Sequence, residues 1–283
     1  MQAYSKAAVK KGREVALVPT MGALHQGHLS LVDVARKKVG PTGMVIVSIY
    51  VNPTQFGQGE DFDSYPRTFD SDRDKCAESG VDVIFCPTDS EMYPQGEAGP
   101  YSVYVIEERL SKTMEGASRP VHFRGVTTIV CKLFNACLPD YAVFGAKDFQ
   151  QSAIIRKMVR DLNFPIEIIV APTFREIDGL AMSSRNVKLS PDERSQAVAL
   201  SLVLQAVRGR VIEAGTPVDV SVLRDLAMSL LGEFPLVSLD YLEFFNLDSL
   251  EPVDPVSVGG HCAIAARLGS VRLIDNIRIS RDW

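Results

Sequence analysis

The chain has 283 residues, of which 46% are hydrophobic and 23% are charged, and its formal net charge is −5. This composition is typical of a folded globular protein with apolar side chains for one large core or two modest ones, and it excludes a disordered chain. The acidic balance argues against a protein that binds nucleic acid or an anionic membrane through a broad basic surface. No apolar run approaches the roughly 18 residues of a spanning helix. Five widely spaced cysteines suggest reduced thiols, so we expect a soluble cytoplasmic protein.

Short β-branched runs alternate with longer helical patterns over the first part of the chain. This alternation predicts βαβ units and an α/β fold with a doubly wound, Rossmann-like parallel sheet over residues 1–175. The expected strands are 15–18, 44–51, 81–86, 141–144 and 166–170. The expected helices are 29–39, 71–79, 126–136 and 149–161. In such sheets ligands collect beyond the carboxyl ends of the strands.

The pattern changes after residue 186. Ser190 and Glu193 have the spacing of a capping box, with Ser190 as the N-cap of a new helix. We expect one long helix from there to about Ala214, a second helix over 221–232, and a small sheet over 240–245, 262–267 and 271–274. Residues 176–283 are therefore expected to form a smaller C-terminal α+β domain, with its boundary near Arg175.

A glycine turn and two histidines follow the first expected strand. His25 and His28 are three residues apart, so they share one face of the helix that they open. A helix N-terminus attracts anions, Gly22 allows a close backbone approach, and imidazoles can donate hydrogen bonds to phosphate oxygens. The pattern favours a nucleotide site, although a surface helix could also carry two such histidines. A metal site is less favoured, because the sequence has only two further histidines and neither a HExxH nor a CxxC pattern.

A second segment, residues 179–186, offers the hydroxyls of Ser183 and Ser184 and the planar guanidinium of Arg185 to phosphate oxygens. Together the two segments resemble the HxGH and KMSKS-like pair of the nucleotidylyltransferase superfamily. More closely, the chain resembles the pantothenate synthetase (pantoate:β-alanine ligase) family. Further segments typical of that family occur in order along nearly the whole chain, at 48–56, 65–67, 118–120, 122–126, 145–151, 267–269 and 273–276.

The resemblance implies the ATP-dependent condensation of pantoate with β-alanine to pantothenate through a pantoyl adenylate, with release of AMP and pyrophosphate. It also implies a homodimer that uses ATP with Mg2+ and has no nucleic-acid or membrane partner. Magnesium is expected to be held mainly by phosphates and water. Asp70 and Asp72 are candidate protein ligands, but a solvated helix start explains them equally well.

The resemblance assigns a role to each candidate site residue. The expected catalytic residues are His28 as the proton donor, His25, Lys147, Ser183, Ser184 and Arg185. The expected ATP-binding residues are Pro19, Thr20, Met21, Gly22, His25, Gly27, His28, Gly145, Lys147, Asp148 at the ribose, Phe174 near adenine, Met182, Ser183, Ser184 and Arg185. The expected substrate-binding residues are Gln55 and Gln151 for pantoate, with Asn52, Arg119 and His122 nearby for phosphates or β-alanine. Residues 1–175 would bind nucleotide and pantoate, and the C-terminal domain would carry the Met182–Arg185 loop as a lid that closes on ATP.

Two other functions stay open from the sequence alone. A nucleotidylyltransferase would move AMP or CMP to a phosphate ester and release a stable product, although the amide-rich segment 52–55 suits such a substrate poorly. A nucleotide sensor without catalysis, or an RNA-binding relative of the tRNA synthetases, would bind ATP without turnover. The acidic balance argues against RNA.

Overall fold

A computed structural model describes residues 1–95 and 100–281 of the chain. These residues divide into two compact units. The first unit comprises Met1–Ala146 and Gln150–Pro172, and the second comprises Lys147–Phe149 and Thr173–Trp283. The three residues Lys147–Phe149 therefore belong to the second unit although their chain neighbours on both sides belong to the first.

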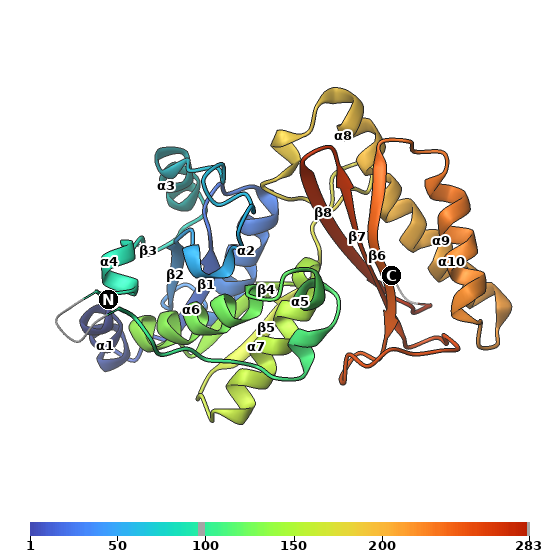
Figure 1. The fold of residues 1–283 in the computed structure, drawn as a ribbon. Coiled ribbons are helices and arrows are strands. Elements are labelled where there is room, and N and C mark those ends of the chain that lie inside the picture. The colour runs from blue at the N-terminus through green and yellow to red at the C-terminus, as the bar shows by residue number, and fades with distance from the viewer. Residues whose placement is uncertain (96–99, 282–283) are drawn as a thin grey trace. The chain divides into compact units, whose positions relative to one another are not determined.

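A five-stranded parallel sheet forms the centre of the first unit and confirms the expected Rossmann-like fold (Figure 1). Its strand order is β3-β2-β1-β4-β5, so the order reverses between β1 and β4, the switch point beside which such sheets bind ligands. The strands are β1 (Val15–Thr20), β2 (Met44–Ile49), β3 (Val83–Phe85), β4 (Tyr141–Gly145) and β5 (Glu167–Ala171).

The central strands are buried on both faces, as expected for a parallel sheet covered by helices. Every residue of β2 is buried. Ala16 and Val18 of β1 pack in an apolar cluster that includes residues of α2 (Gln26–Val39). Because side chains alternate along a strand, Leu17 faces the other side of the sheet, where α6 (His122–Cys137) contacts β1.

The expected helices of the first unit are all present. The helix over 149–161 has the expected ends, and the other three differ from the expected ends by a few residues. The sequence analysis missed α1, which buries only Ser5 and Ala8 and so has a weak apolar pattern. The further helical elements up to residue 161 are α1 (Gln2–Lys10), η1 (Pro53–Gln55), α3 (Phe69–Glu78), α4 (Asp89–Met92), η2 (Leu110–Lys112), α5 (Glu115–Ser118), η3 (Ala146–Asp148) and α7 (Phe149–Asp161).

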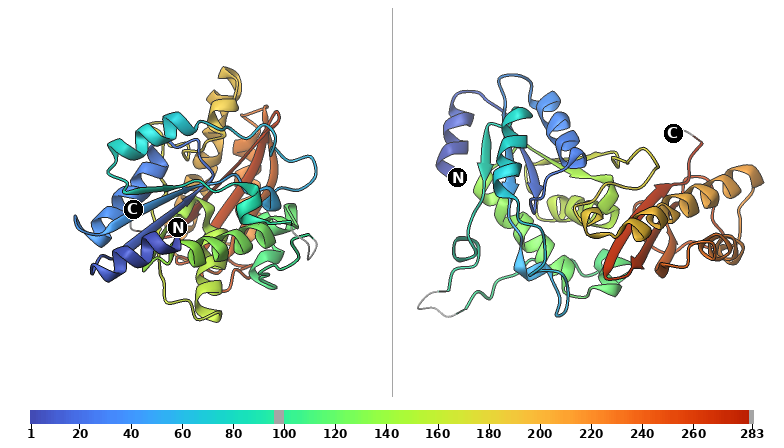
Figure 2. Two further views of the ribbon diagram at one scale, coloured as in Figure 1. Left: turned by 90° about the vertical axis from the view of Figure 1, so that its left-hand side faces the viewer. Right: turned by 90° about the horizontal axis from the view of Figure 1, so that it is seen from above.

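The second unit contains an antiparallel sheet of order β6-β7-β8, formed by β6 (Val237–Phe245), β7 (His261–Leu268) and β8 (Val271–Arg278). Helices α9 (Ala199–Ala214) and α10 (Val220–Leu231) pack against each other and against this sheet, as the views in Figure 2 also show. Their apolar residues and those of the sheet form one core cluster. The expected α+β character of this part of the chain is confirmed.

The helix that begins after Ser190 is shorter than expected. Ser190 Oγ accepts from the N–H of Glu193 at 3.3 Å, and the Glu193 carboxylate accepts from the N–H of Ser190 at 2.8 Å, so the capping box is confirmed. The single long helix is wrong, because α8 (Pro191–Ala197) ends and α9 begins on either side of Val198. Ala197 and Ala199, on either side of Val198, are both fully buried. The short η4 (Asn186–Lys188) precedes α8.

No helix among the described residues is long and apolar enough to cross a membrane. All five cysteines are free thiols. Cys76, Cys137 and Cys262 are buried, whereas Cys86 is exposed.

Candidate functional site

The turn between β1 and α2 is held by two side chains. Thr20 Oγ1 accepts a hydrogen bond from the N–H of Gly22 at 3.2 Å. The carboxylate of Asp72, on α3, accepts from the N–H of Ala23 at 2.9 Å and from that of Leu24 at 2.8 Å. Gly22 has a φ of +86°, and a Cβ there would lie 3.1 Å from the Asp72 carboxylate. The turn therefore needs glycine at this position for both conformation and space.

Asp72 is a functional residue whose role the sequence analysis missed. It is fully buried, and both of its carboxylate oxygens accept backbone hydrogen bonds, so it serves the turn before His25. Nothing near residue 72 in the sequence signals a partner 49 residues away. Asp70 instead lies at the surface, where it pairs with Arg73 at 3.0 Å. Among residues 1–95 and 100–281, no three His, Cys, Asp or Glu side chains group as a metal site.

His25 and His28 cap the N-terminus of α2 with their imidazole rings. His25 Nδ1 accepts from the N–H of Gly27 at 3.1 Å, and His28 Nδ1 accepts from the N–H of His25 at 3.3 Å. A neutral imidazole that accepts at Nδ1 carries its proton on Nε2. The ring centroids are 4.1 Å apart. The first turn of α2 thus has two Nε2–H donors at a helix end that attracts anions.

Asn52 and Gln55 lie directly after β2 and are both buried. Asn52 Nδ2 donates to Gln55 Oε1 at 3.1 Å, and Asn52 Oδ1 accepts from the hydroxyl of Tyr93 at 2.7 Å. Gln55 Nε2 donates to Met21 Sδ at 3.0 Å. The amide of Gln55 therefore links the segment after β2 to the segment after β1, and the structure brings these two predicted site segments together.

Arg119 and His122 contact the backbone of Gln55. Arg119 Nη2 donates to the Gln55 carbonyl at 3.4 Å, and Arg119 Nε donates to the carboxylate of Glu60 at 3.0 Å. His122 Nδ1 lies 3.0 Å from the same carbonyl, which can only accept, so Nδ1 carries the proton. Burial, and then the charge of Arg119, lowers the pKa of His122 to about 4 and keeps the ring neutral.

Helix α6 lies directly against this segment. A Cβ at Gly125 would lie 2.4 Å from the carbonyl oxygen of Thr54 and 2.5 Å from Gln55 Cα. Such a distance is a severe clash, so only glycine permits the backbones of α6 and η1 to approach this closely.

The two glutamines at the start of α7 differ in their surroundings. Gln150 is buried; its Oε1 accepts from the N–H of Glu115 at 3.0 Å, and its Nε2 donates to the carbonyls of Leu110 and Thr113 at 2.7 and 2.8 Å. Gln151, the predicted site residue, is half-buried. Gln150 therefore has a structural role and leaves Gln151 as the candidate substrate contact.

The predicted ATP residues Lys147 and Asp148 belong to the second unit. Lys147 Nζ lies 3.8 Å from Asp148 Oδ1. The carbonyl of Lys147 accepts from Asn276 Nδ2 at 2.8 Å. The ring of Phe149 stacks on that of His261, with centroids 4.1 Å apart and an interplanar angle of 21°. The segment is thus fixed to β7 and β8.

The segment from Phe174 to Arg185 folds back on itself within the second unit. The N–H of Met182 donates to the Phe174 carbonyl at 3.0 Å, and Gly179 takes a φ of +94° in the turn between them. Ser183 Oγ accepts from the N–H of Arg185 at 3.2 Å, and Ser184 is largely buried. Within this unit the structure groups Met182, Ser183, Ser184 and Arg185 on one loop.

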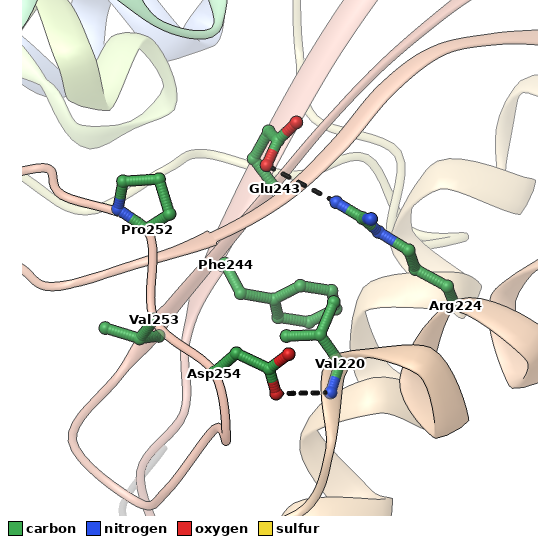
Figure 3. Close-up of a pocket in the computed structure, with 7 residues that line it drawn as sticks. All are labelled: Val220, Arg224, Glu243, Phe244, Pro252, Val253 and Asp254. Carbon is green, nitrogen blue, oxygen red and sulfur yellow. Dashed lines mark hydrogen bonds and ion pairs between the residues drawn. The ribbon is translucent and has the colours of Figure 1, made fainter.

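A pocket of about 430 Å³ in the second unit contains none of the predicted site residues (Figure 3). Its charged groups are used internally, since Arg224 pairs with Glu243 at 3.6 Å and Asp254 Oδ1 accepts from the N–H of Val220 at 3.0 Å. The lining residues are Val220, Arg224, Glu243, Phe244, Pro252, Val253 and Asp254. We do not assign this pocket to the site.

A doubly wound sheet, with an imidazole pair capping the helix that follows its first strand, defines a nucleotide-binding α/β enzyme of the HxGH class. The family model for pantoate-beta-alanine ligase matches residues 1–278, and the chain belongs to this family. It is 50% identical over 282 residues to the pantothenate synthetase of Citrifermentans bemidjiense, covering 100% of this chain and 97% of that protein.

Two solved structures are similar along the whole chain. The crystal structure of pantothenate synthetase from Thermus thermophilus has a TM-score of 0.89 at 43% identity and covers 98% of this chain and 97% of that one. The pantoate-beta-alanine ligase from Francisella tularensis, complexed with beta-gamma ATP and beta-alanine, has a TM-score of 0.79 at 31% identity. That match covers 98% of this chain and 95% of the other.

Proposed function

We propose that this chain joins pantoate to β-alanine in an ATP-dependent reaction that passes through a pantoyl adenylate and releases AMP and pyrophosphate. The imidazole pair that caps α2 is the structural observation that carries the proposal, because it offers two N–H donors to phosphate oxygens. Membership of the ligase family supports the same reaction. So does the presence of beta-gamma ATP and beta-alanine in the ligase from Francisella tularensis.

The reaction needs activation of a carboxylate. In the first step a carboxylate oxygen of pantoate bonds to the α-phosphorus of ATP, and the bond from that phosphorus to the bridging oxygen of pyrophosphate breaks. In the second step the neutral amine of β-alanine attacks the acyl carbon, AMP leaves with the oxygen that it shared with that carbon, and the new amide loses a proton. Both steps need alignment and charge stabilisation more than a protein nucleophile.

We assign the phosphates of ATP to residues of three segments of the chain. His25 and His28 donate through Nε2–H to phosphate oxygens, with His28 as the proton donor to the leaving group. Lys147, Ser183, Ser184 and Arg185 neutralise or hydrogen-bond further phosphate oxygens. The backbone of Pro19, Thr20, Met21, Gly22, Gly27, Gly145 and Met182 completes the phosphate and nucleoside contacts. Asp148 binds the ribose hydroxyls and Phe174 lies near adenine.

Pantoate is small and anionic, and we propose that neutral amide side chains, not cationic ones, bind it. Gln55 and Gln151 bind its hydroxyl and carboxylate oxygens, with Asn52 orienting the amide of Gln55. Arg119 and His122 already contact the carbonyl of Gln55. We therefore propose that they serve the substrates through Gln55. We also propose that residues 1–175 form the pantoate- and nucleotide-binding domain while 176–283 act as a lid, although Lys147–Phe149 and residues 173–175 group with the second compact unit.

Magnesium is proposed to accompany ATP, held mainly by phosphates and water. Asp72 does not fit a direct ligand, because its side chain is fully buried and its two oxygens accept from the N–H groups of Ala23 and Leu24. We also propose a homodimer that acts in the cytoplasm, where five free thiols persist. Sedimentation that finds only a 31.0 kDa species would reject the dimer.

The proposal is tested by measuring AMP and pyrophosphate release from ATP while pantoate and β-alanine are omitted in turn. Sustained AMP release only when both are present, with pantothenate identified by mass, supports the ligase. Sustained release of pyrophosphate without any amine, with a stable nucleotidylated product, would identify a nucleotidylyltransferase instead. Tight ATP binding with no turnover under any combination would identify a sensor.

A further inference from the structure

Two adjacent residues of β8, Asp275 and Asn276, are polar yet almost completely buried, and the proposed function gives them no role. Successive side chains of a strand point to opposite faces. Each of the two can therefore reach a different part of the second unit. Both lie within the segment 273–276, which resembles the ligase family but has no obvious chemistry of its own.

Asn276 holds the segment of Lys147. Because the Lys147 carbonyl can only accept, the amide nitrogen of Asn276 faces it at 2.8 Å, and the amide oxygen is left to accept from His261 Nε2 at 2.8 Å. Burial lowers the pKa of His261 to about 4, so the ring is neutral with its proton on Nε2. His261 also stacks on Phe149. The histidine thereby fixes the orientation of the amide that holds Lys147.

Asp275 holds the stem of the loop that carries Arg185. Its two carboxylate oxygens accept from Arg175 Nη1 at 2.6 Å and from Nη2 at 3.0 Å. Arg175 also donates to the carbonyl of Gly179 at 3.0 Å and pairs through its backbone with Ala181. A buried, bidentate pair of this kind fixes orientation as well as distance.

We propose that Asp275 and Asn276 are positioning residues that hold the two phosphate-contacting segments of the second unit, Asn276 through Lys147 and Asp275 through the loop from Arg175 to Arg185. This inference rests on the proposed function, since it requires Lys147 and Arg185 to contact ATP. Its consequence is that Lys147 and Arg185, which belong to the same compact unit, are both held from one strand, β8.

The test for Asn276 is a double-mutant cycle with Lys147. The rate of pantoyl adenylate formation is measured in a single turnover with saturating pantoate and varied ATP for Lys147→Ala, Asn276→Ala and the double variant. We expect losses of about 10² to 10³-fold for Lys147→Ala and about 10- to 10²-fold for Asn276→Ala. If Asn276 acts through Lys147, the double variant is within about twofold of Lys147→Ala alone.

The outcomes separate this inference from the function on which it rests. A normal rate for Lys147→Ala would overturn the proposed role of Lys147 itself. An impaired Lys147→Ala together with a normal Asn276→Ala, or with fully additive losses in the double variant, would overturn only the positioning role. If Asn276→Ala merely lowered stability, the melting temperature would fall, but the rate of adenylate formation by the folded protein would depend on ATP as in the wild type. That result would overturn the positioning role.

For Asp275, the same double-mutant cycle combines Asp275→Asn with Arg185→Ala. A second cycle replaces Asp275→Asn by the milder Arg175→Lys, which keeps the charge but loses the bidentate contact. We expect non-additive losses in both cases. The matched control is Asp240→Asn. This substitution removes the 2.7 Å ion pair between Asp240, on β6, and Arg272, which lies on β8 as Asp275 does. A control loss as large as that of Asp275→Asn, or additivity with Arg185→Ala, would contradict the inference.

Discussion

His28 Nδ1 accepts a hydrogen bond from the backbone N–H of His25 at 3.3 Å. The contact does two things at once. It satisfies one of the N–H groups left unpaired at a helix N-terminus, and it fixes the His28 proton on Nε2, where it can be donated to a phosphate oxygen. Helix capping and the proposed chemistry therefore depend on opposite nitrogens of one ring.

These two roles of His28 can be separated by substitution. His28→Ala is expected to lower the rate of adenylate formation about 10² to 10³-fold and to destabilise the protein by about 1 kcal/mol through loss of the cap. His28→Asn offers an amide oxygen to the N–H of His25 but has no donor at the position of Nε2. It should recover stability in urea unfolding without recovering rate. Recovery of the rate by His28→Asn would argue against the donor role.

Asp72 should control the position of His25 without touching substrate. Asp72→Ala leaves the N–H groups of Ala23 and Leu24 without their buried acceptor, at a cost of about 1–3 kcal/mol for each unsatisfied group. Ala23 has a positive φ of 50°, so Ala23→Gly in the Asp72→Ala background should restore part of the stability. Unfolding by urea measures both effects.

Asp70→Ala is the control for this experiment, because the side chain of Asp70 is exposed and pairs only at the surface. Its effect should stay within about 0.5 kcal/mol. A loss for Asp72→Ala no larger than that of Asp70→Ala would contradict the role assigned to Asp72.

Gly125→Ala should weaken pantoate binding, since a Cβ would clash with the backbone of Thr54 and Gln55. We expect the KM for pantoate to rise about tenfold or more, as small displacements of a contacting group often cause, while the KM for ATP changes little. Gly209→Ala is the matched control, because nothing lies within 4 Å of a Cβ there. That substitution in α9 should leave kinetics unchanged and stabilise by about 0.5–1 kcal/mol. Equal rises of both KM values in Gly125→Ala would refute the assignment of Gln55 to pantoate.

His122 should make stability depend on pH below neutrality. Burial and the charge of Arg119 lower its pKa from 6.5 to about 4 in the folded protein, although the carboxylates of Glu115 and Glu60 act in the opposite direction. Between these values the unfolded chain binds a proton that the folded chain does not. The contribution of the neutral His122 ring to the free energy of unfolding is therefore present above pH 6.5 and is lost as the pH falls towards 4.

The loss in the free energy of unfolding that comes from His122 amounts to about 3 kcal/mol at most. Urea unfolding of the wild type and of His122→Gln at a pH of about 7 and a pH of about 4.5 measures it, because glutamine does not titrate. The wild type should lose more stability than the variant on acidification. The same loss in both proteins would show that His122 does not contribute.

Local patterns in the sequence predicted much of the fold. Helix α7 begins and ends at the residues expected, and the strands of the parallel sheet are found because doubly buried strands are continuous apolar runs. The division of the helix at Val198 was not predicted, since no glycine or proline marks it in the sequence.

The parts of the site that depend on distant partners could not be predicted from the sequence. Asn276 contacts the backbone of Lys147 across 129 residues, and Asp72 contacts that of Ala23 across 49. The candidate phosphate and pantoate residues could be named from motifs, but nothing in those motifs indicates which buried side chains hold them. The resemblance places Arg119 near the phosphates or β-alanine, but nothing in its motif indicates that its guanidinium pairs with Glu60.

The central claim is that the carboxylate of pantoate attacks the α-phosphorus of ATP, and its most direct test follows oxygen. Pantoate labelled with ¹⁸O in the carboxylate is turned over with ATP and β-alanine, and the AMP is analysed by mass. The account predicts that each AMP carries one ¹⁸O atom from pantoate, because the bond between the acyl carbon and that oxygen breaks in the second step. AMP without label, with both ¹⁸O atoms remaining elsewhere, would contradict the adenylate route.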